Sequence, residues 1–304
     1  MPGLADAAVV QVLELRAALL AAIRRFFRER DFIEVETPTI VPSPGLDVHL
    51  SAFEVQDPKG QPVGWLATSP EYQMKRLLSA GAQRIFQLCR CYRGEEQGRH
   101  HEREFTMLEW YRANATSDDV IRDTEELLAF VASALDQPAP EVQPPWERMT
   151  VDDALQFHAN VALESLADDE ERFFRVWAEE VQPRLGNQRP VIVTDWPASM
   201  ASLAKLKPNG MADRFEAFFR GVELCNGFGE LTDADEQRRR FVRDRSERLA
   251  AGLPVYPIDD QFLADLERGM PESGGNALGV DRLLMLLVGA ESIQAVIPFP
   301  EERL

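Results

Sequence analysis

Charged and aromatic side chains gather in the segment GRHHEREFTMLEWY, residues 98–111. A metal site is the first interpretation to test, because a helical zinc motif places two histidines four residues apart with a glutamate after the first. Here His101 and Glu102 fit the start of that motif, but Phe105 stands where the second histidine would be. The segment therefore does not predict a zinc site, and its charges need another explanation.

The same loop belongs to one of three segments that together resemble the signature motifs of class II aminoacyl-tRNA synthetases. The first is the helix and strand ending at Pro38, the second is the hairpin from Arg93 to Glu104, and the third is GVDR at residues 279–282. Each motif is short and loose alone, whereas the three in this order and spacing are a strong signal. The resemblance implies that the chain activates a carboxylate with ATP.

The chemistry of that reaction explains the residue types. When a carboxylate attacks the α-phosphate of ATP, negative charge builds between two anions, which fixed guanidinium groups and Mg²⁺ can hold without reorganisation. By the resemblance, Arg93 would grip the α-phosphate and the substrate carboxylate, and Arg282 the γ-phosphate. Glu216 and Glu223 would carry Mg²⁺, because hard oxygen ligands suit that ion. The implied ATP-binding residues are Arg93, Glu95, His101, Glu102, Phe105, Glu223, Leu224, Gly279 and Arg282.

A cluster of carboxylates indicates which amino acid is activated. The segments TSPEYQMKRLL, EFTMLEWY and ELCNGFGELTD are similar to those of lysyl-tRNA synthetases and their close relatives. By that similarity Glu71 would meet an amino group near the substrate carboxylate, and Glu230, Glu109 and Tyr111 would receive a distal ammonium. Several acceptors around one pocket are what a diamino acid requires, because a buried ammonium must be paired or it loses its proton. The implied substrate-binding residues are Ser69, Pro70, Glu71, Glu109, Tyr111, Asn226, Glu230 and Ala277.

Two related activities fit these motifs. Lysyl-tRNA synthetases carry an N-terminal OB-fold domain that grips the anticodon, whereas this chain of 304 residues starts directly with the helix of the first motif. Its formal charge of −18 also disfavours tRNA as a partner, since Lys and Arg contacts to phosphate dominate non-specific binding of nucleic acids. The nearest match is the stand-alone family that attaches (R)-β-lysine to a lysine side chain of elongation factor P. We therefore expect (R)-β-lysine or lysine as substrate and elongation factor P as acceptor.

Local differences bear on this choice. The synthetases usually have Gly-x-Gly-x-Asp-Arg where this chain has Ala277 at the first position, and one methyl group biases substrate choice by about 1–3 kcal/mol without fixing it. Both families usually have Asn-Pro where this chain has Glu102-Arg103, and Glu102 would repel phosphate unless Arg103 or Arg99 pairs with it. A truncated enzyme that acylates tRNA or another acceptor, and a non-catalytic regulatory paralogue, stay open as alternatives.

The elements that position these residues follow from the spacing of apolar side chains. Strands joined by hairpins and by long helical excursions, without a regular βαβ rhythm, indicate an α+β fold with an antiparallel sheet flanked by helices. Helices are predicted at Val9–Arg28, Asp118–Leu135, Leu163–Val181, Asp233–Leu249 and Asp259–Arg268. Strands are predicted at Phe32–Pro38, Arg84–Tyr92, Phe105–Tyr111, Val191–Thr194 and, as a pair, Arg214–Phe228.

Composition and cysteine content set the remaining expectations. An apolar fraction of 45% suits one globular catalytic domain over residues 1–304, with a helical insertion at about 160–187 and no anticodon-binding domain. Cys89 and Cys91 lie too close along a strand for a relaxed disulfide, and with Cys225 they fit a reducing cytoplasm. From the sequence we expect no membrane span and no secretory signal, because no apolar run is long enough to cross a bilayer and no basic and apolar leader pattern is present. The resemblance also implies a homodimer, because the first motif usually builds the two-fold interface in this class.

Overall fold

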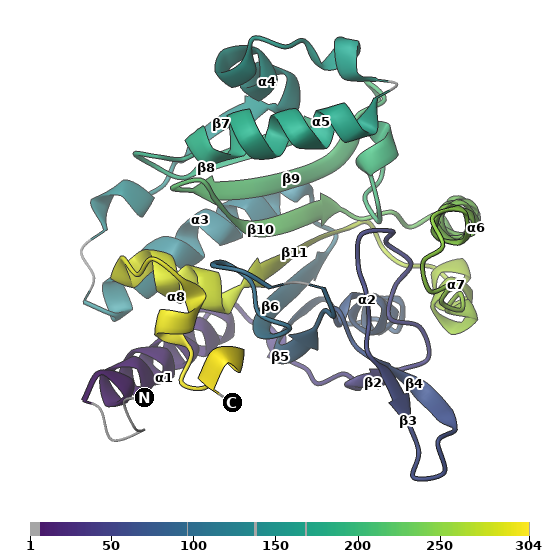
Figure 1. Ribbon diagram of the computed structural model, residues 1–304, viewed down its shortest axis with the longest axis horizontal. Coiled ribbons are helices and arrows are strands. Elements are labelled where there is room, and N and C mark those ends of the chain that lie inside the picture. Colours follow the sequence, from purple (N-terminus) through teal and green to yellow (C-terminus); the bar gives the residue numbers. More distant parts are fainter. Residues whose placement is uncertain (1–6, 96, 137–138, 168, 304) are drawn as a thin grey trace.

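An eight-stranded sheet forms the centre of the fold (Figure 1). The computed structural model describes residues 7–95, 97–136, 139–167 and 169–303. The strand order is β1-β5-β6-β11-β10-β9-β8-β7, and neighbours are antiparallel except the parallel edge pairs β1 with β5 and β7 with β8. The strands are β1 Ile33–Glu34, β5 Arg84–Tyr92, β6 Glu104–Ala113, β7 Glu147–Thr150, β8 Val191–Trp196, β9 Ala212–Phe219, β10 Val222–Gly229 and β11 Ser273–Gly279.

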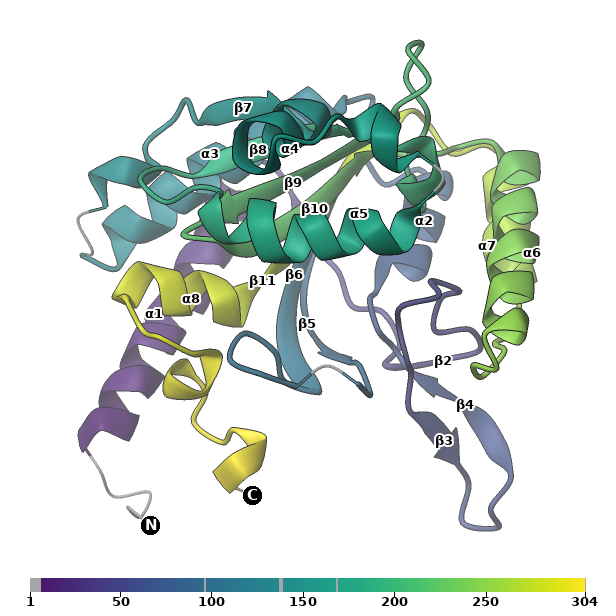
Figure 2. The ribbon, with the colours of Figure 1, turned by 45° about the horizontal axis from the view of Figure 1, so that its top comes forward.

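Three helices cover one face of this sheet and bury the largest apolar cluster (Figures 1 and 2). They are α1 Ala7–Arg28, α3 Ser117–Ala134 and α8 Val280–Val288. Successive side chains of a strand point to opposite faces, so Leu108 and Trp110 of β6 face these helices. Phe27 of α1 stacks on Phe86 of β5 with ring centroids 4.7 Å apart. This packing fixes the back of the sheet and leaves its other face for polar residues.

A second group of elements covers only one end of the opposite face. Helices α2 Glu71–Ser79, α6 Ala234–Ala250 and α7 Asp260–Glu267 pack around Phe241 and Phe262, and a small sheet in the order β2-β4-β3 lies beside them. Its strands are β2 Ile40–Val41, β3 Glu54–Gln56 and β4 Pro62–Leu66. Helices α6 and α7 begin after Asp233 and Asp259, whose side chains accept hydrogen bonds from backbone N–H groups three residues later. These are the aspartates with which the predicted helices begin.

The segment between β7 and β8 packs on the far end of the sheet. It contains α4 Val151–Ala159, α5 Glu170–Val176 and a π-helical turn at Trp177–Val181, which share an apolar cluster with β8 and β9. The predicted insertion at about 160–187 falls here, apart from residue 168, which lies outside the described residues. The sequence analysis missed β7 and α4, although Thr150 and Asp153 form a capping box. Short 3₁₀ turns occupy Pro140–Val142, Leu163–Leu166, Gln182–Arg184, Ala198–Met200, Ile293–Val296 and Glu301–Arg303.

The predicted fold class is confirmed, since helices flank a mainly antiparallel sheet. The long hairpin is β5 and β6, which pair from Arg84 with Arg112 to Tyr92 with Glu104. The predicted strand pair at residues 214–228 is β9 and β10. Among the described helices, none is long and apolar enough to cross a membrane.

A buried ion pair joins α1, β6 and α8 behind the sheet. Arg16 Nη1 lies 2.5 Å from Asp281 Oδ1, and Arg16 Nη2 donates to Thr106 Oγ1 at 2.6 Å. The backbone N–H of Thr106 donates to the other carboxylate oxygen of Asp281 at 2.8 Å. Asp281 directly precedes Arg282 in the third motif. The ion pair therefore fixes the first turn of α8, from which the side chain of Arg282 projects.

We predict that Arg16→Leu lowers the free energy of unfolding by about 3–5 kcal/mol, because it leaves Asp281 buried without its cation. Urea denaturation followed by tryptophan fluorescence measures the change. The matched control is Arg122→Leu, which removes an ion pair with Asp119 whose arginine side chain is 58% exposed, and which should cost about 1 kcal/mol or less. Equal losses in the two variants would contradict a structural role for the buried pair.

Candidate active site

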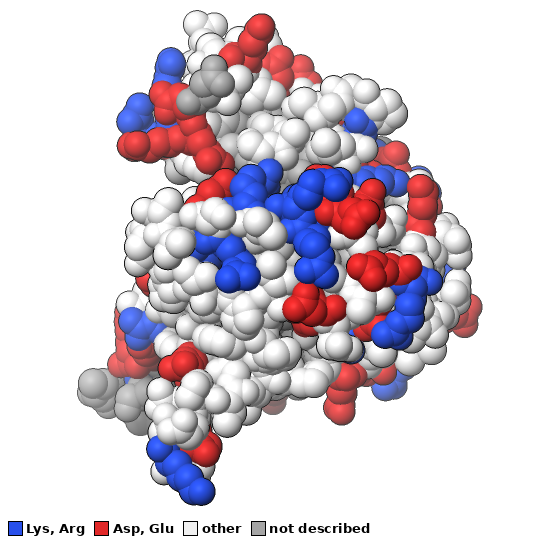
Figure 3. Space-filling view, turned by 90° about the vertical axis from the view of Figure 1, so that its right-hand side faces the viewer, with Lys and Arg blue, Asp and Glu red and all other residues white. Residues whose placement is uncertain are grey.

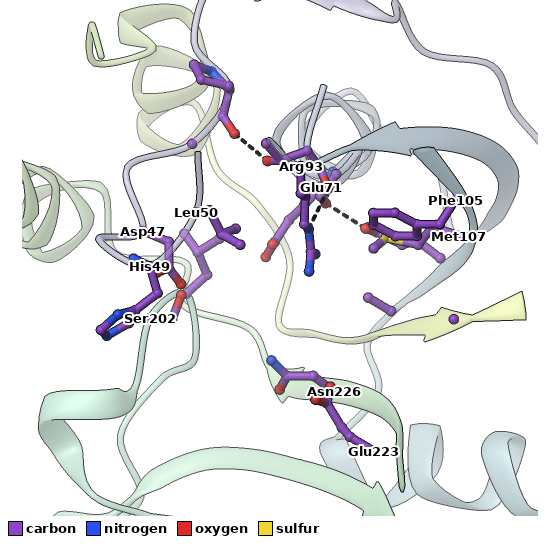
Figure 4. A pocket seen from close by; sticks show the side chains of 18 of the residues that line it. Asp47, His49, Leu50, Glu71, Arg93, Phe105, Met107, Ser202, Glu223 and Asn226 are labelled. Carbon is purple, nitrogen blue, oxygen red and sulfur yellow. Dashed lines mark hydrogen bonds between the residues drawn. The ribbon is translucent and has the colours of Figure 1, made fainter. Parts of the chain in front are cut away.

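A cavity of about 420 Å³ opens on the sheet face opposite α1, α3 and α8. Its floor is made by β6, β9, β10 and β11, and its walls by the start of α2, residues 43–50 and part of α6. In the close view, Glu71 and Arg93 lie on one side and Glu223 and Asn226 on the other (Figure 4). On the face of the molecule that carries α6 and α7, acidic and basic side chains are interspersed (Figure 3).

Most of the residues predicted from the sequence line this one cavity. Arg93 comes from the end of β5 and Arg282 from the start of α8, and the fold brings both to the same space. The other predicted residues that line it are Ser69, Glu71, His101, Glu102, Phe105, Glu109, Glu216, Glu223, Leu224, Asn226, Ala277 and Gly279. The three motifs therefore meet although they are far apart in the chain.

Four predicted residues lie outside the lining. Glu95 is exposed on the hairpin loop, and Pro70 precedes α2, where its carbonyl oxygen accepts from Met74 N at 3.0 Å. Tyr111 and Glu230 are buried behind the lining residues. Tyr111 donates a hydrogen bond to Glu109, which lines the cavity, and Glu230 pairs with Lys75.

Arg282 is held by residues of the predicted ATP-binding set. Its Nη2 lies 2.6 Å from His101 Nε2, and its Nη1 donates to the backbone oxygen of Glu223 at 3.1 Å. Because arginine only donates, His101 Nε2 must accept, which requires a neutral imidazole with its proton on Nδ1. Arg282 Nε also donates to the backbone oxygen of His100 at 3.1 Å. Burial, followed by the charges of Arg282 and Arg99, lowers the pKa of the neighbouring His100.

Arg93 lies over an aromatic ring. Its guanidinium carbon is 5.1 Å from the ring centroid of Phe105, and its Nε is 3.5 Å from the backbone oxygen of Thr68. A guanidinium and a ring at this distance attract each other. Phe105 lies beside Met107 in the close view (Figure 4). The second motif thus presents a cation, Arg93, and a flat apolar ring, Phe105, to the same cavity.

Glu102 pairs differently from what the sequence suggested. Its Oε1 accepts from Gln294 Nε2 at 2.9 Å and its Oε2 from the backbone N–H of Glu301 at 3.3 Å. Arg103 instead forms an ion pair with the side chain of Glu301. Pairing with Arg103 or Arg99 was the condition under which Glu102 would not repel phosphate, and among the described contacts the carboxylate of Glu102 is held instead by the C-terminal segment. That segment folds back over the hairpin, where Ile293 N donates to the backbone oxygen of Arg99 at 3.0 Å.

The two predicted magnesium ligands stand on adjacent strands. Glu216 on β9 is buried, and Glu223 on β10 is part-exposed with its Oε2 3.7 Å from Arg282 Nη1. Burial raises the pKa of Glu216 to about 7; the charge of Arg214 opposes this shift, and that of Glu223 adds to it. Two carboxylates together with substrate phosphates are a common donor set for Mg²⁺, so these residues fit that ion. Arg214, which the sequence analysis missed, also lines the cavity and pairs with Glu216.

At the other end of the cavity a carboxyl group is held by two hydroxyls. Glu109 accepts from Ser69 Oγ at 2.6 Å and from the Tyr111 hydroxyl at 2.9 Å. Burial is the main reason that the pKa of Glu109 rises to about 8, and the charge of Glu71 adds to it. An incoming cation would reverse this shift, because it favours the ionised carboxylate. Glu109 is therefore poised to ionise when an ammonium group arrives.

Lys75 is the main residue that sequence reasoning missed. Its side chain is fully buried, and its Nζ lies 2.6 Å from Glu71 Oε1 and 2.6 Å from Glu230 Oε2. Burial lowers the pKa of Lys75, but the charges of Glu230 and Glu71 outweigh burial and raise it. The two glutamates predicted to meet substrate amino groups thus already share an internal ammonium. The Glu71–Lys75 spacing of four residues on α2 was the available signal.

We predict that binding of lysine at pH 7 releases protons, because Glu109 changes from mainly protonated to ionised. Protons are released rather than taken up because the pKa of Glu109, about 8 in the free protein, falls when the ammonium binds. Affinity should rise as the pH rises from 6 to 8, by at most about tenfold per unit. Calorimetry in two buffers of different ionisation enthalpy measures the release, which should vanish near pH 9.

The variant Glu95→Gln is the control, since Glu95 is exposed and outside the cavity, and it should leave this release unchanged. A binding enthalpy that does not depend on the buffer at pH 7 would show that Glu109 is already ionised in the free protein, contrary to the prediction.

Comparison with known proteins shows which sequences this chain is similar to. The family model described as tRNA synthetases class II (D, K and N) matches residues 3–303. A protein of Edwardsiella ictaluri named elongation factor P–(R)-β-lysine ligase is 45% identical over 306 residues, which cover 95% of this chain and 94% of that protein. Proteins of the same name are 44% identical in Klebsiella pneumoniae, with the same coverage, and 43% identical in Proteus mirabilis, over 98% of this chain and 97% of that protein.

Proposed function

The chain belongs to the class II tRNA synthetases (D, K and N), in the group of elongation factor P–(R)-β-lysine ligases, and from this premise we propose its function. It is a ligase that uses ATP to activate (R)-β-lysine and transfers the β-lysyl group to a lysine ε-amine of elongation factor P. The observation that carries the proposal is the meeting of Arg93 and Arg282 at one cavity whose other end holds buried carboxyl groups.

The first half-reaction joins the amino acid to AMP. The substrate carboxylate attacks the α-phosphorus, the bond to the β-phosphate breaks and pyrophosphate leaves. Arg93 is proposed to hold the carboxylate and the α-phosphate together, with Phe105 under the adenine. Arg282 is proposed to bind the γ-phosphate, since His101 and Glu223 fix its guanidinium at the cavity wall. Mg²⁺ held by Glu216 and Glu223 would add positive charge beside the phosphates.

The second half-reaction forms an amide. The uncharged ε-amine of the acceptor lysine attacks the activated carbonyl carbon, the bond to the phosphate oxygen breaks, AMP leaves and the amine loses a proton. No separate base is required of the chain if positioning is sufficient and a phosphate or a cavity carboxylate accepts that proton. The reducing cytoplasm is the proposed location, which the three free cysteines fit.

The amino acid pocket supports a diamino substrate. Glu109 lines the cavity, burial raises its pKa to about 8, and Ser69 and Tyr111 orient it. Ala277 on β11 is paired with Glu109 on one side and with Asn226 on the other. Its methyl group therefore borders the proposed substrate site, where it would bias selection between the β- and α-amino acid.

We predict that the chain exchanges labelled pyrophosphate into ATP faster with (R)-β-lysine than with α-lysine. Arg93→Ala and Arg282→Ala should each lower this rate by about 10²–10³, the loss typical of a fixed donor to transition-state charge. The matched control is Arg90→Ala. Arg90 lies on β5, the strand that directly precedes Arg93, but its side chain is exposed and pairs with Glu104. It should keep most of the activity.

Transfer is measured with purified elongation factor P and with tRNA as acceptors. Exchange followed by transfer to tRNA, and not to elongation factor P, would favour a truncated synthetase. No exchange with either lysine, in a folded protein, would favour a regulatory paralogue.

We also propose that the chain is a homodimer through its first motif. Apolar side chains are exposed along this region, with Val10 51%, Leu13 48% and Ile33 62% accessible. Strand β1, which carries Ile33, is an edge strand of the main sheet. Exposed apolar side chains on α1 and β1 are what an interface through the first motif would cover.

We predict that Leu13→Glu weakens this dimer by at least about tenfold, because it places a charge among apolar contacts. Light scattering over a dilution series measures the dissociation. Leu249→Glu is the control, since Leu249 is 71% exposed on α6, on a different side of the molecule, and should not change the mass. A single-chain mass for the unmodified protein at micromolar concentration would contradict the proposal.

A further inference from the structure

Three sulfur atoms form a cluster beneath the cavity that the proposed reaction does not use. Cys89 Sγ lies 3.8 Å from Cys91 Sγ, and Cys91 Sγ lies 3.9 Å from Met107 Sδ. Cys89 and Cys91 share one face of β5, because residues two apart on a strand point the same way. Cys89 is directly opposite Met107 in the pairing of β5 with β6. The hairpin itself therefore brings the three sulfurs together.

The spacing of these sulfurs fits a shared metal ion. With metal–thiolate bonds of about 2.3 Å, sulfur ligands in trigonal or tetrahedral arrangement lie about 3.8–4.0 Å from each other. Two of the three separations, 3.8 Å between Cys89 Sγ and Cys91 Sγ and 3.9 Å between Cys91 Sγ and Met107 Sδ, fall in this range. A disulfide has a sulfur–sulfur bond of about 2.0 Å and suits less extended backbone, so the same cysteines on a regular strand fit a disulfide poorly.

From this geometry we propose that Cys89, Cys91 and Met107 bind one soft monovalent metal ion, Cu(I). The ligand chemistry selects the ion, since two thiolates and a thioether favour Cu(I), whereas zinc prefers cysteine, histidine and carboxylate ligands. The described residues hold no group of three histidine, cysteine, aspartate or glutamate side chains that could bind a metal. The third ligand here is instead the thioether of Met107.

Binding is a ligand exchange without oxidation or reduction. Cu(I) displaces the two thiol protons, forms two metal–thiolate bonds and accepts a lone pair from the thioether, so two protons are released to solvent. The two thiolates and one univalent cation leave one negative charge. The contact with Cys89 and burial raise the pKa of the Cys91 thiol well above its usual value, and the charge of Arg93, two residues further on, opposes this shift. A metal cation between the sulfurs would lower it, because a coordinated thiol loses its proton.

The position of the cluster connects it to the cavity. Met107 lines the cavity, and Cys91 is paired across the hairpin with Phe105, over which Arg93 lies. Cys91 is fully buried, whereas Cys89 is part-exposed and offers the ion a route from the strand surface. A bound ion would hold the side chain of Met107 toward β5. The wall beneath the proposed nucleotide site would therefore change shape when the cluster is occupied.

The test is an anaerobic titration of the whole chain with Cu(I) buffered by a chromogenic chelator. We expect one ion per chain, held in competition with the chelator, with release of two protons. X-ray absorption of the loaded protein should show about three sulfur neighbours near 2.3 Å. Cys89→Ser and Cys91→Ser should each lower the affinity for Cu(I) by at least about 10–100-fold. That is the loss typical when a residue that only hydrogen-bonds to a metal ligand is removed. Met107→Leu should leave two sulfur neighbours.

Two matched controls keep the outcome specific. Cys225→Ala removes a buried thiol from the helix-covered core, and Met149→Leu removes a thioether near α4, and neither should change the stoichiometry or the affinity. Loss of the ion in Cys225→Ala would overturn the proposal, as would binding by Cys91→Ser as tight as in the unmodified protein. Tighter binding of Zn²⁺ than of Cu(I) at the same residues would overturn the assignment of the ion.

Discussion

The structure depends on the alternation of side chains along its central strands. In β6, Leu108 and Trp110 face the helices and Met107 and Glu109 face the cavity, because successive residues of a strand point to opposite sides. A shift of the pairing by one residue would exchange these two sets and put a carboxyl group into the apolar core. The register that buries the core is therefore the same register that builds the candidate site.

Charged side chains in and directly behind the cavity lining pair mainly with each other. Lys75 lies between Glu71 and Glu230, and Arg214 pairs with Glu216. Each ion pair reduces the cost of burying its partner, since a lone buried charge would be strongly destabilising. Glu109 is different, because hydroxyl groups rather than a cation hold it. It is the carboxyl group best suited to respond to a cationic ligand.

The second motif contacts both the C-terminal segment and the cavity. Its outer loop is held by the C-terminal segment, through Gln294 and the backbone of Glu301 on Glu102. Its strands carry Phe105 and Arg93 toward the cavity, and the sulfurs of Cys89 and Cys91 lie just before that point. A change in the packing of this hairpin would therefore reach the proposed nucleotide site directly, because no loop separates the two.

The sequence by itself determined the fold class and the hairpin, and most of the residues that it predicted for the site line the cavity, because these follow from local periodicity and from motifs with residues in fixed order. It also placed Arg93 and Arg282 in one site, through resemblance to a family. Only the tertiary structure decided what each buried charge pairs with. Lys75 pairs with Glu230 as well as with Glu71 of its own helix, and Glu102 accepts a hydrogen bond from Gln294 of the C-terminal segment. Glu230 and Gln294 come from elements whose approach no local pattern specifies.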